Sequence, residues 1–141
     1  MKARIKWLEQ ATYMAESGSG HAVIVDGPPD IGGRNLGVRP MELVLMGVGA
    51  CSAVDVVHIL KKSRQDVRDC ECELEAERAA ADPKVFTKIR MHFKVSGREL
   101  KENQVARAVQ LSAEKYCSAS IMLQKGGVEI SHTHEIVPLP A

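Results

Sequence analysis

The sequence has few aromatic residues and no excess of charge of either sign. Aromatic side chains make up 4% of the 141 residues, so stacking on bases or sugars has few carriers beyond Trp7, Tyr13 and Tyr116. The 19 basic and 18 acidic residues are interspersed and give a formal net charge of +1. A nucleic-acid surface or a polybasic membrane-binding segment needs concentrated positive charge. We therefore expect neither nucleic acid nor a membrane as a partner.

The amino-terminal segment lacks the continuous apolar region of a secretory signal, because residues 1–7 alternate charged and apolar side chains. The corresponding expectation is a cytoplasmic location. In a reducing compartment the four cysteines are expected as thiols rather than as structural disulfides. The chain has no internal repeat, and its length suffices for one domain with an ample core. We therefore predict a single domain over residues 1–141.

Alternating side chains predict three strands near the amino terminus. In residues 2–8 the apolar side chains fall on one face and the basic ones on the other, which is typical of a half-buried strand. Further strands, from about Thr12 and over residues 21–25, flank a Ser-Gly turn. These strands predict an antiparallel meander. Residues 26–37 follow and are too rich in Gly and Pro for a helix or a strand.

An apolar stretch over residues 39–60 is the centre of the predicted fold. Pro40 suits the first turn of a helix, and most of the following residues carry no charge. A helix that is apolar on every face belongs in a core or in a membrane. Ser52, Asp55 and His58 interrupt the run short of a bilayer span. We predict a buried central helix that carries a thiol.

The second half of the chain predicts a long hairpin, two helices and a last strand. Residues 70–77 and 87–95 alternate strictly around an Asp-Pro break, with acidic outward positions on one strand and basic ones on the other. A second helix is expected to bury one face, formed by Val105, Ala108, Val109, Ser112 and Tyr116.

Ser118 is the predicted cap of a short third helix over residues 119–125, and a strand over residues 128–137 completes the sheet. This order of elements predicts an α+β fold with antiparallel sheets and helices on one side.

Cys51 is the first candidate for chemistry. A free cysteine often serves as a small buried hydrophobe, so its position alone favours a structural role. The small residues Gly47, Gly49 and Ala50 before it permit close approach by another element, and Arg39 near the head of the helix is a cation of the kind that stabilises a thiolate.

Glu42 precedes Cys51 by 51 − 42 = 9 residues, which places the two on opposite sides of an ideal helix and about 13.5 Å apart along its axis. Glu42 is therefore either an acidic residue favoured by the helix dipole or part of a site that another copy of the chain completes.

Cys117 is the second candidate, because it lies at the junction of two predicted helices. A helix amino terminus favours a thiolate there, although a core thiol is again the alternative. The spacing does not show whether Cys117 meets Cys51. If the two do meet, attack of one on a peroxide gives a sulfenic acid, which the other converts to a disulfide.

The remaining cysteines and a histidine pair point to structure rather than to a metal. Cys70 and Cys72 alternate with Leu74 and are expected to face inward from a strand. His132 and His134 share one strand face, but the neighbouring sequence offers no third ligand. We therefore expect no metal and no cofactor.

Three stretches together resemble the OsmC/Ohr family, most closely its small OsmC-like proteins of the YhfA type. They are Arg-Pro-Met-Glu-Leu-Val-Leu from Arg39, Cys-Ser-Ala-Val-Asp-Val-Val from Cys51, and Ala-Glu-Lys-Tyr-Cys-Ser around Cys117. The resemblance covers nearly the whole chain and implies an OsmC-like fold as an intertwined homodimer. In that assembly the apolar central helix would be half core and half subunit interface.

The resemblance also implies roles for single residues. Cys51 would be the peroxidatic cysteine and Cys117 the resolving cysteine of one chain. Glu42 of the other chain would be the carboxylate that orients an arginine of that same chain. Arg39 and Arg34 are the candidates for that arginine, and neither is at a clean match to the family pattern. The implied activity is reduction of organic hydroperoxides, with re-reduction by dithiols of the dihydrolipoyl type. The alternative is a non-catalytic redox sensor or small-ligand binding protein on the same scaffold.

Overall fold

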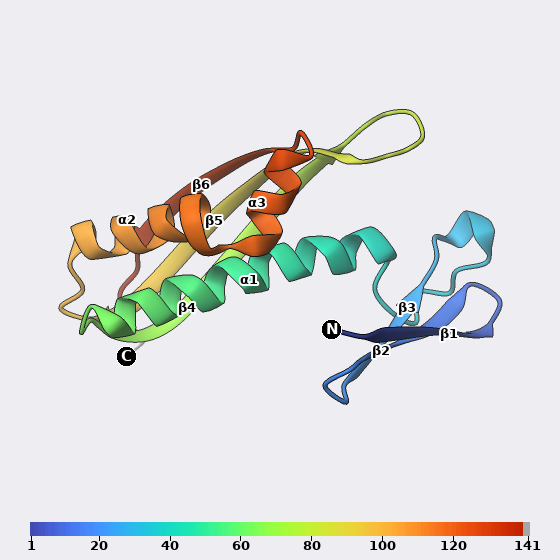
Figure 1. Cartoon of the computed structure of the whole chain (residues 1–141), viewed down its shortest axis with the longest axis horizontal. Helices are drawn as coiled ribbons and strands as arrows, with labels where there is room; N and C mark the ends of the chain where they lie inside the picture. Colours follow the sequence, from blue (N-terminus) through green and yellow to red (C-terminus); the bar gives the residue numbers. More distant parts are fainter. Residues whose placement is uncertain (140–141) are drawn as a thin grey trace. The chain divides into compact units, whose positions relative to one another are not determined.

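The computed structural model describes residues 1–139 (Figure 1). The chain forms two compact units, Met1–Val44 and Leu45–Ala141. The boundary falls inside the central helix α1 (Pro40–Lys62), which begins in the first unit and continues into the second. The predicted single domain over residues 1–141 therefore contains two compact parts, which are described separately below.

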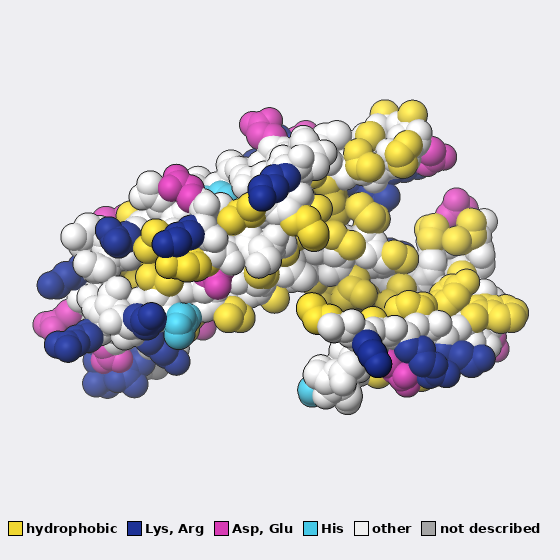
Figure 2. Space-filling model, viewed as in Figure 1, with side chains coloured by type: hydrophobic (Ala, Val, Ile, Leu, Met, Phe, Trp, Pro, Cys, Tyr) yellow, Lys and Arg dark blue, Asp and Glu magenta, His cyan; other side chains and the backbone are white. Residues whose placement is uncertain are grey.

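The first unit contains the predicted antiparallel meander. Strands β1 (Ala3–Glu9), β2 (Thr12–Ser17) and β3 (Ala22–Asp26) pair in the order β1-β2-β3. All residues of β1 are exposed, so the face that was expected to be half-buried is open to solvent in the single chain. Exposed apolar side chains of this unit include Ile5, Trp7, Leu8, Tyr13, Val23 and Ile24. Apolar side chains reach the surface in both units (Figure 2).

A buried carboxylate fixes the loop that follows β3. Asp26 accepts hydrogen bonds from the backbone N–H groups of Arg34 (3.0 Å) and Leu36 (3.1 Å) and from the hydroxyl of Thr12 (3.3 Å). The two backbone N–H groups lower the pKa of Asp26 most. The loop includes the short helix η1 (Pro29–Ile31). Its backbone is thus held by hydrogen bonds to the carboxylate of Asp26, the last residue of β3.

Helix α1 begins at Pro40, as predicted. The backbone N–H of Arg39 donates to the carboxylate of Glu42 at 2.8 Å, which satisfies a donor at the helix amino terminus. One stripe of α1 is buried, formed by Val48, Gly49, Ser52, Val56 and Leu60. By length and composition alone α1 is long and apolar enough to cross a membrane. In the single chain, 28% of its most apolar stretch is buried. The single chain therefore buries one stripe of α1 instead of every face.

The second unit contains a mixed sheet in the order β4-β5-β6. Strands β4 (Asp66–Arg78) and β5 (Phe86–Arg98) form the predicted antiparallel hairpin. Strand β6 (Glu129–Ile136) instead pairs with β5 in parallel, where an antiparallel strand was expected. The reason is that the helices between β5 and β6 form a crossover, which returns the chain to the starting end of β5. Helices α1, α2 and α3 lie on one face of this sheet (Figure 1).

The core of the second unit lies between β5 and the helices. Alternate residues of β5 are buried, as are residues of α1 and of α2 (Glu102–Leu111): Ile89, Met91, Phe93, Val95, Val56, Leu60, Val105, Ala108 and Val109. The opposite face of the hairpin carries the expected cross-strand pairs, Lys94 with Glu73 at 2.6 Å and Arg90 with Glu77 at 3.2 Å. These pairs are exposed to solvent, so each contributes little to stability.

A π-helical turn separates α2 from α3. It rotates the residues after Ser112 relative to the face of the helix that is predicted to be buried. The turn, η2 (Ser112–Tyr116), widens the helix, so Ser112 is buried but Tyr116 is exposed. The prediction that Tyr116 lies on the buried face was therefore wrong. Helix α3 (Ser118–Lys125) follows, and its N-cap is Cys117 instead of the predicted Ser118.

Candidate functional site

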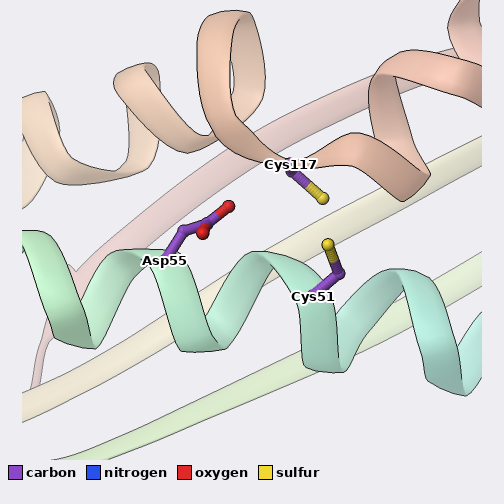
Figure 3. A group of neighbouring side chains, drawn as sticks. All are labelled: Cys51, Asp55 and Cys117. Atoms are coloured by element: carbon purple, nitrogen blue, oxygen red, sulfur yellow. The ribbon is translucent and has the colours of Figure 1, made fainter.

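The structure brings the two candidate cysteines together within the second unit. Cys51 projects from α1, and Cys117 projects toward it from the break between η2 and α3 (Figure 3). The sulfur atoms of Cys51 and Cys117 and a carboxylate oxygen of Asp55 all lie within 4.8 Å of one another. Both cysteines are free thiols. Residues that are 66 positions apart in the chain thus form one local cluster.

The π turn explains how Cys117 comes to face α1. The residue occupies an extended conformation (φ −74°, ψ 95°) between two helical segments, and its side chain caps α3. Its sulfur accepts hydrogen bonds from the hydroxyl of Ser52 at 3.0 Å and from the backbone N–H of Ser120 at 3.4 Å. Cys117 is fully buried, so these donors replace water around the sulfur.

The surroundings of Cys51 differ from those of Cys117. Cys51 is half-buried on α1, and the backbone N–H of Ala119 in the first turn of α3 acts to lower its pKa. Close packing of α1 on β4 helps to position Cys51, because a Cβ added at Gly49 would lie 2.6 Å from a methyl carbon of Leu74. The expectation that a small residue allows close approach before Cys51 is thus confirmed at Gly49.

The surroundings shift the two thiol pKa values in opposite directions. Burial raises the pKa of Cys51, and the hydrogen bond with Cys117 and the negative charge of Asp55 add to the rise. Burial also acts to raise the pKa of Cys117, but hydrogen bonds from Ser120 and Ser52 outweigh it, so that the pKa of Cys117 is lowered. Of the two thiols, Cys117 therefore loses its proton more readily than Cys51.

Asp55 is the member of the cluster that the sequence analysis did not select. Its carboxylate accepts a hydrogen bond from the buried hydroxyl of Ser112 at 3.3 Å, which orients it toward the sulfurs. The signal was present in the sequence, because Asp55 follows Cys51 by four residues and so lies on the same side of the helix one turn later. Ser52 was likewise interpreted only as an interruption of the apolar run.

A pocket of about 410 Å³ adjoins the cluster through Asp55. It is lined by Asp55, His58, Ile59, Lys62, Ser63, Arg107, Leu111 and Tyr116. These residues come from α1, α2, η2 and the residue that follows α1. The pocket offers a small molecule a route to the side of the cluster where Asp55 lies.

The three other predicted site residues belong to the first unit. Arg34 forms an ion pair with Glu9 at 2.9 Å and donates to the hydroxyl of Thr12 at 3.1 Å. Arg39 donates a guanidinium N–H to the carbonyl of Gly37 at 3.1 Å, and Glu42 accepts the backbone N–H of Arg39. Glu42 thus has a local role at the start of α1 in the single chain.

The second pair of cysteines has the structural setting that the sequence predicts. Cys70 and Cys72 lie on the less exposed face of β4 and are half-buried. Burial raises the pKa of Cys70, and it raises the pKa of Cys72 to about 12. In the histidine pair, His134 bonds to Glu102 at 2.6 Å, whereas Nε2 of His132 is buried without a partner among the described residues.

The fold and the site define an α+β protein with two converging free thiols. The family model described as OsmC-like protein matches residues 32–133, and the chain belongs to this family. The match crosses the boundary between the two units. Protein YhfA of Escherichia coli strain K12 is 53% identical over 137 residues, which cover 97% of this chain and 98% of YhfA. The resemblance drawn from the three sequence motifs is therefore confirmed.

Solved structures have the same fold. A hypothetical protein from Aquifex aeolicus VF5 is 31% identical with a TM-score of 0.85, and the match covers 99% of this chain and 97% of that one. An organic hydroperoxide resistance protein OsmC from Legionella pneumophila, described as a predicted redox protein, has a TM-score of 0.71 at 19% identity over 95% of each chain. These structures show that the chain has the OsmC-like fold.

Proposed function

We propose that the protein is a thiol-dependent peroxidase that reduces organic hydroperoxides, with Cys51 as the peroxidatic and Cys117 as the resolving cysteine. The observation that carries the proposal is the convergence of the two sulfurs from α1 and from the cap of α3. A disulfide needs the sulfurs about 2.05 Å apart, so a modest movement of the side chains would join them. Cysteines that meet in this way, with backbone N–H donors beside them, suit a reversible dithiol cycle.

The proposed cycle has three balanced steps. The thiolate of Cys51 attacks the distal peroxide oxygen, which gives a Cys51 sulfenic acid and, after uptake of a proton, an alcohol. The thiolate of Cys117 attacks the Cys51 sulfur, and the sulfenic oxygen leaves with a proton as water. An external dithiol of the dihydrolipoyl type then reduces the Cys51–Cys117 disulfide and is itself oxidised to a disulfide.

The hydrogen bonds to Cys117 support its role in the second and third steps. The donors from Ser52 and Ser120 favour the thiolate, which is the nucleophile in the second step and the leaving group in the third. Cys51 is the less buried of the two sulfurs and is therefore the one that peroxide and reductant would reach. The apolar residues around Cys51 on α1 favour an apolar hydroperoxide.

We further propose that the active form is a homodimer. Exposed apolar side chains on α1, among them Met46 at 52% and Val54 at 68% exposure, support a partner surface along that helix. The thiolate of Cys51 needs a cation, because burial and the charge of Asp55 both raise the pKa of Cys51. An arginine from a second copy would supply it, as in the family pattern.

Arg39 is the better candidate for that cation. Its guanidinium donates to a single carbonyl oxygen, that of Gly37, among the described residues, whereas the guanidinium of Arg34 is already paired with Glu9. Replacing Arg39 with Gln should lower peroxidase activity by about 10²-fold, because a preorganised charge at a reacting centre contributes on that order. Arg4→Gln, a change in an exposed arginine on β1, serves as the matched control and should leave the activity unchanged.

The test is turnover of an alkyl hydroperoxide with dihydrolipoamide. Wild-type protein should consume peroxide over many cycles, and Cys51→Ser should reduce consumption to the rate seen without protein. Cys70→Ser is the matched control, since it removes a half-buried thiol outside the cluster. Full activity in Cys51→Ser would disprove the assignment. A single oxidation per chain without turnover would instead favour the redox-sensor alternative.

A further inference from the structure

We propose that Cys51, Cys117 and Asp55 form a binding site for a zinc ion in the reduced protein. The three side chains converge from α1 and from the cap of α3, with their ligand atoms within 4.8 Å of one another (Figure 3). The proposal concerns metal binding itself and does not require the chain to be a peroxidase.

The donor set suits zinc. Two thiolates and one carboxylate are ligands that zinc accepts, with Zn–S about 2.3 Å and Zn–O about 2.0 to 2.2 Å. In a tetrahedral site these lengths separate two ligand atoms by roughly 3.5 to 3.8 Å. The observed spread of up to 4.8 Å therefore closes around an ion by small side-chain rotations. Magnesium and calcium prefer all-oxygen sites, so the two sulfurs select against them.

The scaffold brings the ligands together before any metal arrives. Cys51 and Asp55 are four residues apart on a long helix, which places both on one side of it. Cys117 is fixed by its position between η2 and α3 and is fully buried. A site built on rigid elements loses little conformational entropy when the ion binds.

Hydrogen bonds from outside the ligand set orient two of the three ligands. The hydroxyl of Ser112 donates to Asp55 at 3.3 Å, and the hydroxyl of Ser52 donates to the sulfur of Cys117 at 3.0 Å. The backbone N–H of Ser120 in the first turn of α3 donates to the same sulfur at 3.4 Å. Such outer contacts are typical of protein metal sites, where they fix ligand geometry and offset negative charge.

The fourth coordination position would be open. Asp55 lines the pocket beside the cluster, so water or a small anion could reach the metal from that side. The basic side chains of Lys62 and Arg107 also line the pocket and suit an anionic fourth ligand. Zinc sites with three protein ligands keep such an open position, whereas closed four-ligand sites are structural.

Binding and oxidation would compete for the same sulfurs. Coordination releases the remaining thiol protons to solvent, and the bound ion then slows the attack of the sulfurs on peroxide. Oxidation of the zinc-bound pair by one hydroperoxide and two protons would give the Cys51–Cys117 disulfide, one alcohol, one water and free zinc. This consequence alone rests on the proposed peroxidase function, and its failure would leave the binding result intact.

The first experiment measures zinc affinity of the fully reduced protein by competition with a chromophoric chelator. We expect one zinc per chain in the wild type and an affinity at least about tenfold lower in Asp55→Asn, because a ligand is lost. Asp30→Asn, which changes an exposed carboxylate of η1, is the matched control and should bind zinc with the affinity of the wild type. Equal affinity in Asp55→Asn and the wild type would overturn the proposal.

The second experiment identifies the sulfur ligands with cobalt as a spectroscopic substitute. Wild-type protein should give thiolate-to-cobalt charge-transfer absorption and the visible bands of a tetrahedral ion, and Cys51→Ser and Cys117→Ser should each weaken the charge transfer. Cys70→Ser should leave the spectrum unchanged. Cys72 lies near enough for its charge to interact with that of Cys117, so Cys72→Ser is the stringent control. Loss of the spectrum in Cys72→Ser, with Asp55→Asn unaffected, would assign the site to other ligands and disprove the proposal.

Discussion

The two pairs of cysteines in the second unit differ in how their members come together and in what surrounds the sulfurs. Cys51 and Cys117 come from distant parts of the chain and converge between α1 and the start of α3. Hydrogen bonds lower the pKa of Cys117, although burial raises that of Cys51. Cys70 and Cys72 are neighbours on one strand, face the interior of the unit, and have raised pKa values because of burial. Proximity in sequence therefore says little about whether two thiols can react together.

The difference lies in the surroundings of the sulfur. A thiol in an apolar environment keeps its proton and acts as a small hydrophobe. A thiol at the start of a helix, next to serine hydroxyl groups, has donors that stabilise the thiolate. We infer that the pair between the helices performs the chemistry and that the pair on the strand contributes to packing.

The largest expected effect is the selectivity of disulfide formation. Mild treatment with an organic hydroperoxide should link Cys51 to Cys117, because the sulfurs of those two residues already converge. Residues two apart on an extended strand have Cα atoms roughly 6.6 Å apart, which is near the upper limit for a disulfide. Peptide mapping by mass spectrometry measures both products. A predominant Cys70–Cys72 disulfide would contradict the comparison.

Removing one hydrogen-bond donor should raise the pKa of Cys117 and slow its oxidation. In Ser52→Ala the sulfur loses the hydroxyl at 3.0 Å, so the pKa of Cys117 should rise. A hydrogen bond to a charged group is worth about 1.5 to 3 kcal/mol, so disulfide formation near neutral pH should slow by about tenfold or more. Stopped-flow measurement of the oxidation rate against pH tests this. Ser118→Ala, an exposed change next to Cys117, is the control and should leave the rate unchanged.

Overpacking the contact between α1 and β4 should destabilise the unit that holds the cluster. In Gly49→Val the added side chain would collide with Leu74, at a cost of about 1 to 3 kcal/mol in the free energy of unfolding. Gly47→Val is the control, because a Cβ at Gly47 meets no atom within 4 Å. Urea denaturation of the two variants should give a clearly lower midpoint for Gly49→Val. Equal midpoints would contradict the predicted close packing.

The smallest expected effect is a pH dependence from Cys72. Its folded pKa of about 12 lies above the ordinary value of 9.0, so the folded chain retains a proton that the unfolded chain releases. This contribution to stability is fully present below pH 9 and is lost as the pH rises toward 12. The fall in unfolding free energy over that range should be shallower in Cys72→Ala than in the wild type. Parallel curves would show that Cys72 titrates normally.

Local sequence patterns correctly predicted most of the fold. Alternation identified the strands of both sheets, Pro40 marked the start of α1, and the residues around Cys51 and Cys117 indicated the family. These successes share a cause, because period, capping and turn chemistry act between residues that are close in the chain. The direction of β6 was missed because strand pairing depends on where a crossover returns the chain.

The sequence by itself determined which residues carry thiols and which elements hold them. Only the tertiary structure decided which thiols meet. A π turn of five residues altered the phase of the helix after Ser112, exposed Tyr116 and turned Cys117 toward α1. Packing then buried the sulfurs and placed Asp55 and Ser52 beside them, so that burial, charge and hydrogen bonds together shift the two pKa values in opposite directions. The physical reason is that solvation and electrostatics depend on neighbours in space, and Ser52 lies beside Cys117 although the two are 65 residues apart in the chain.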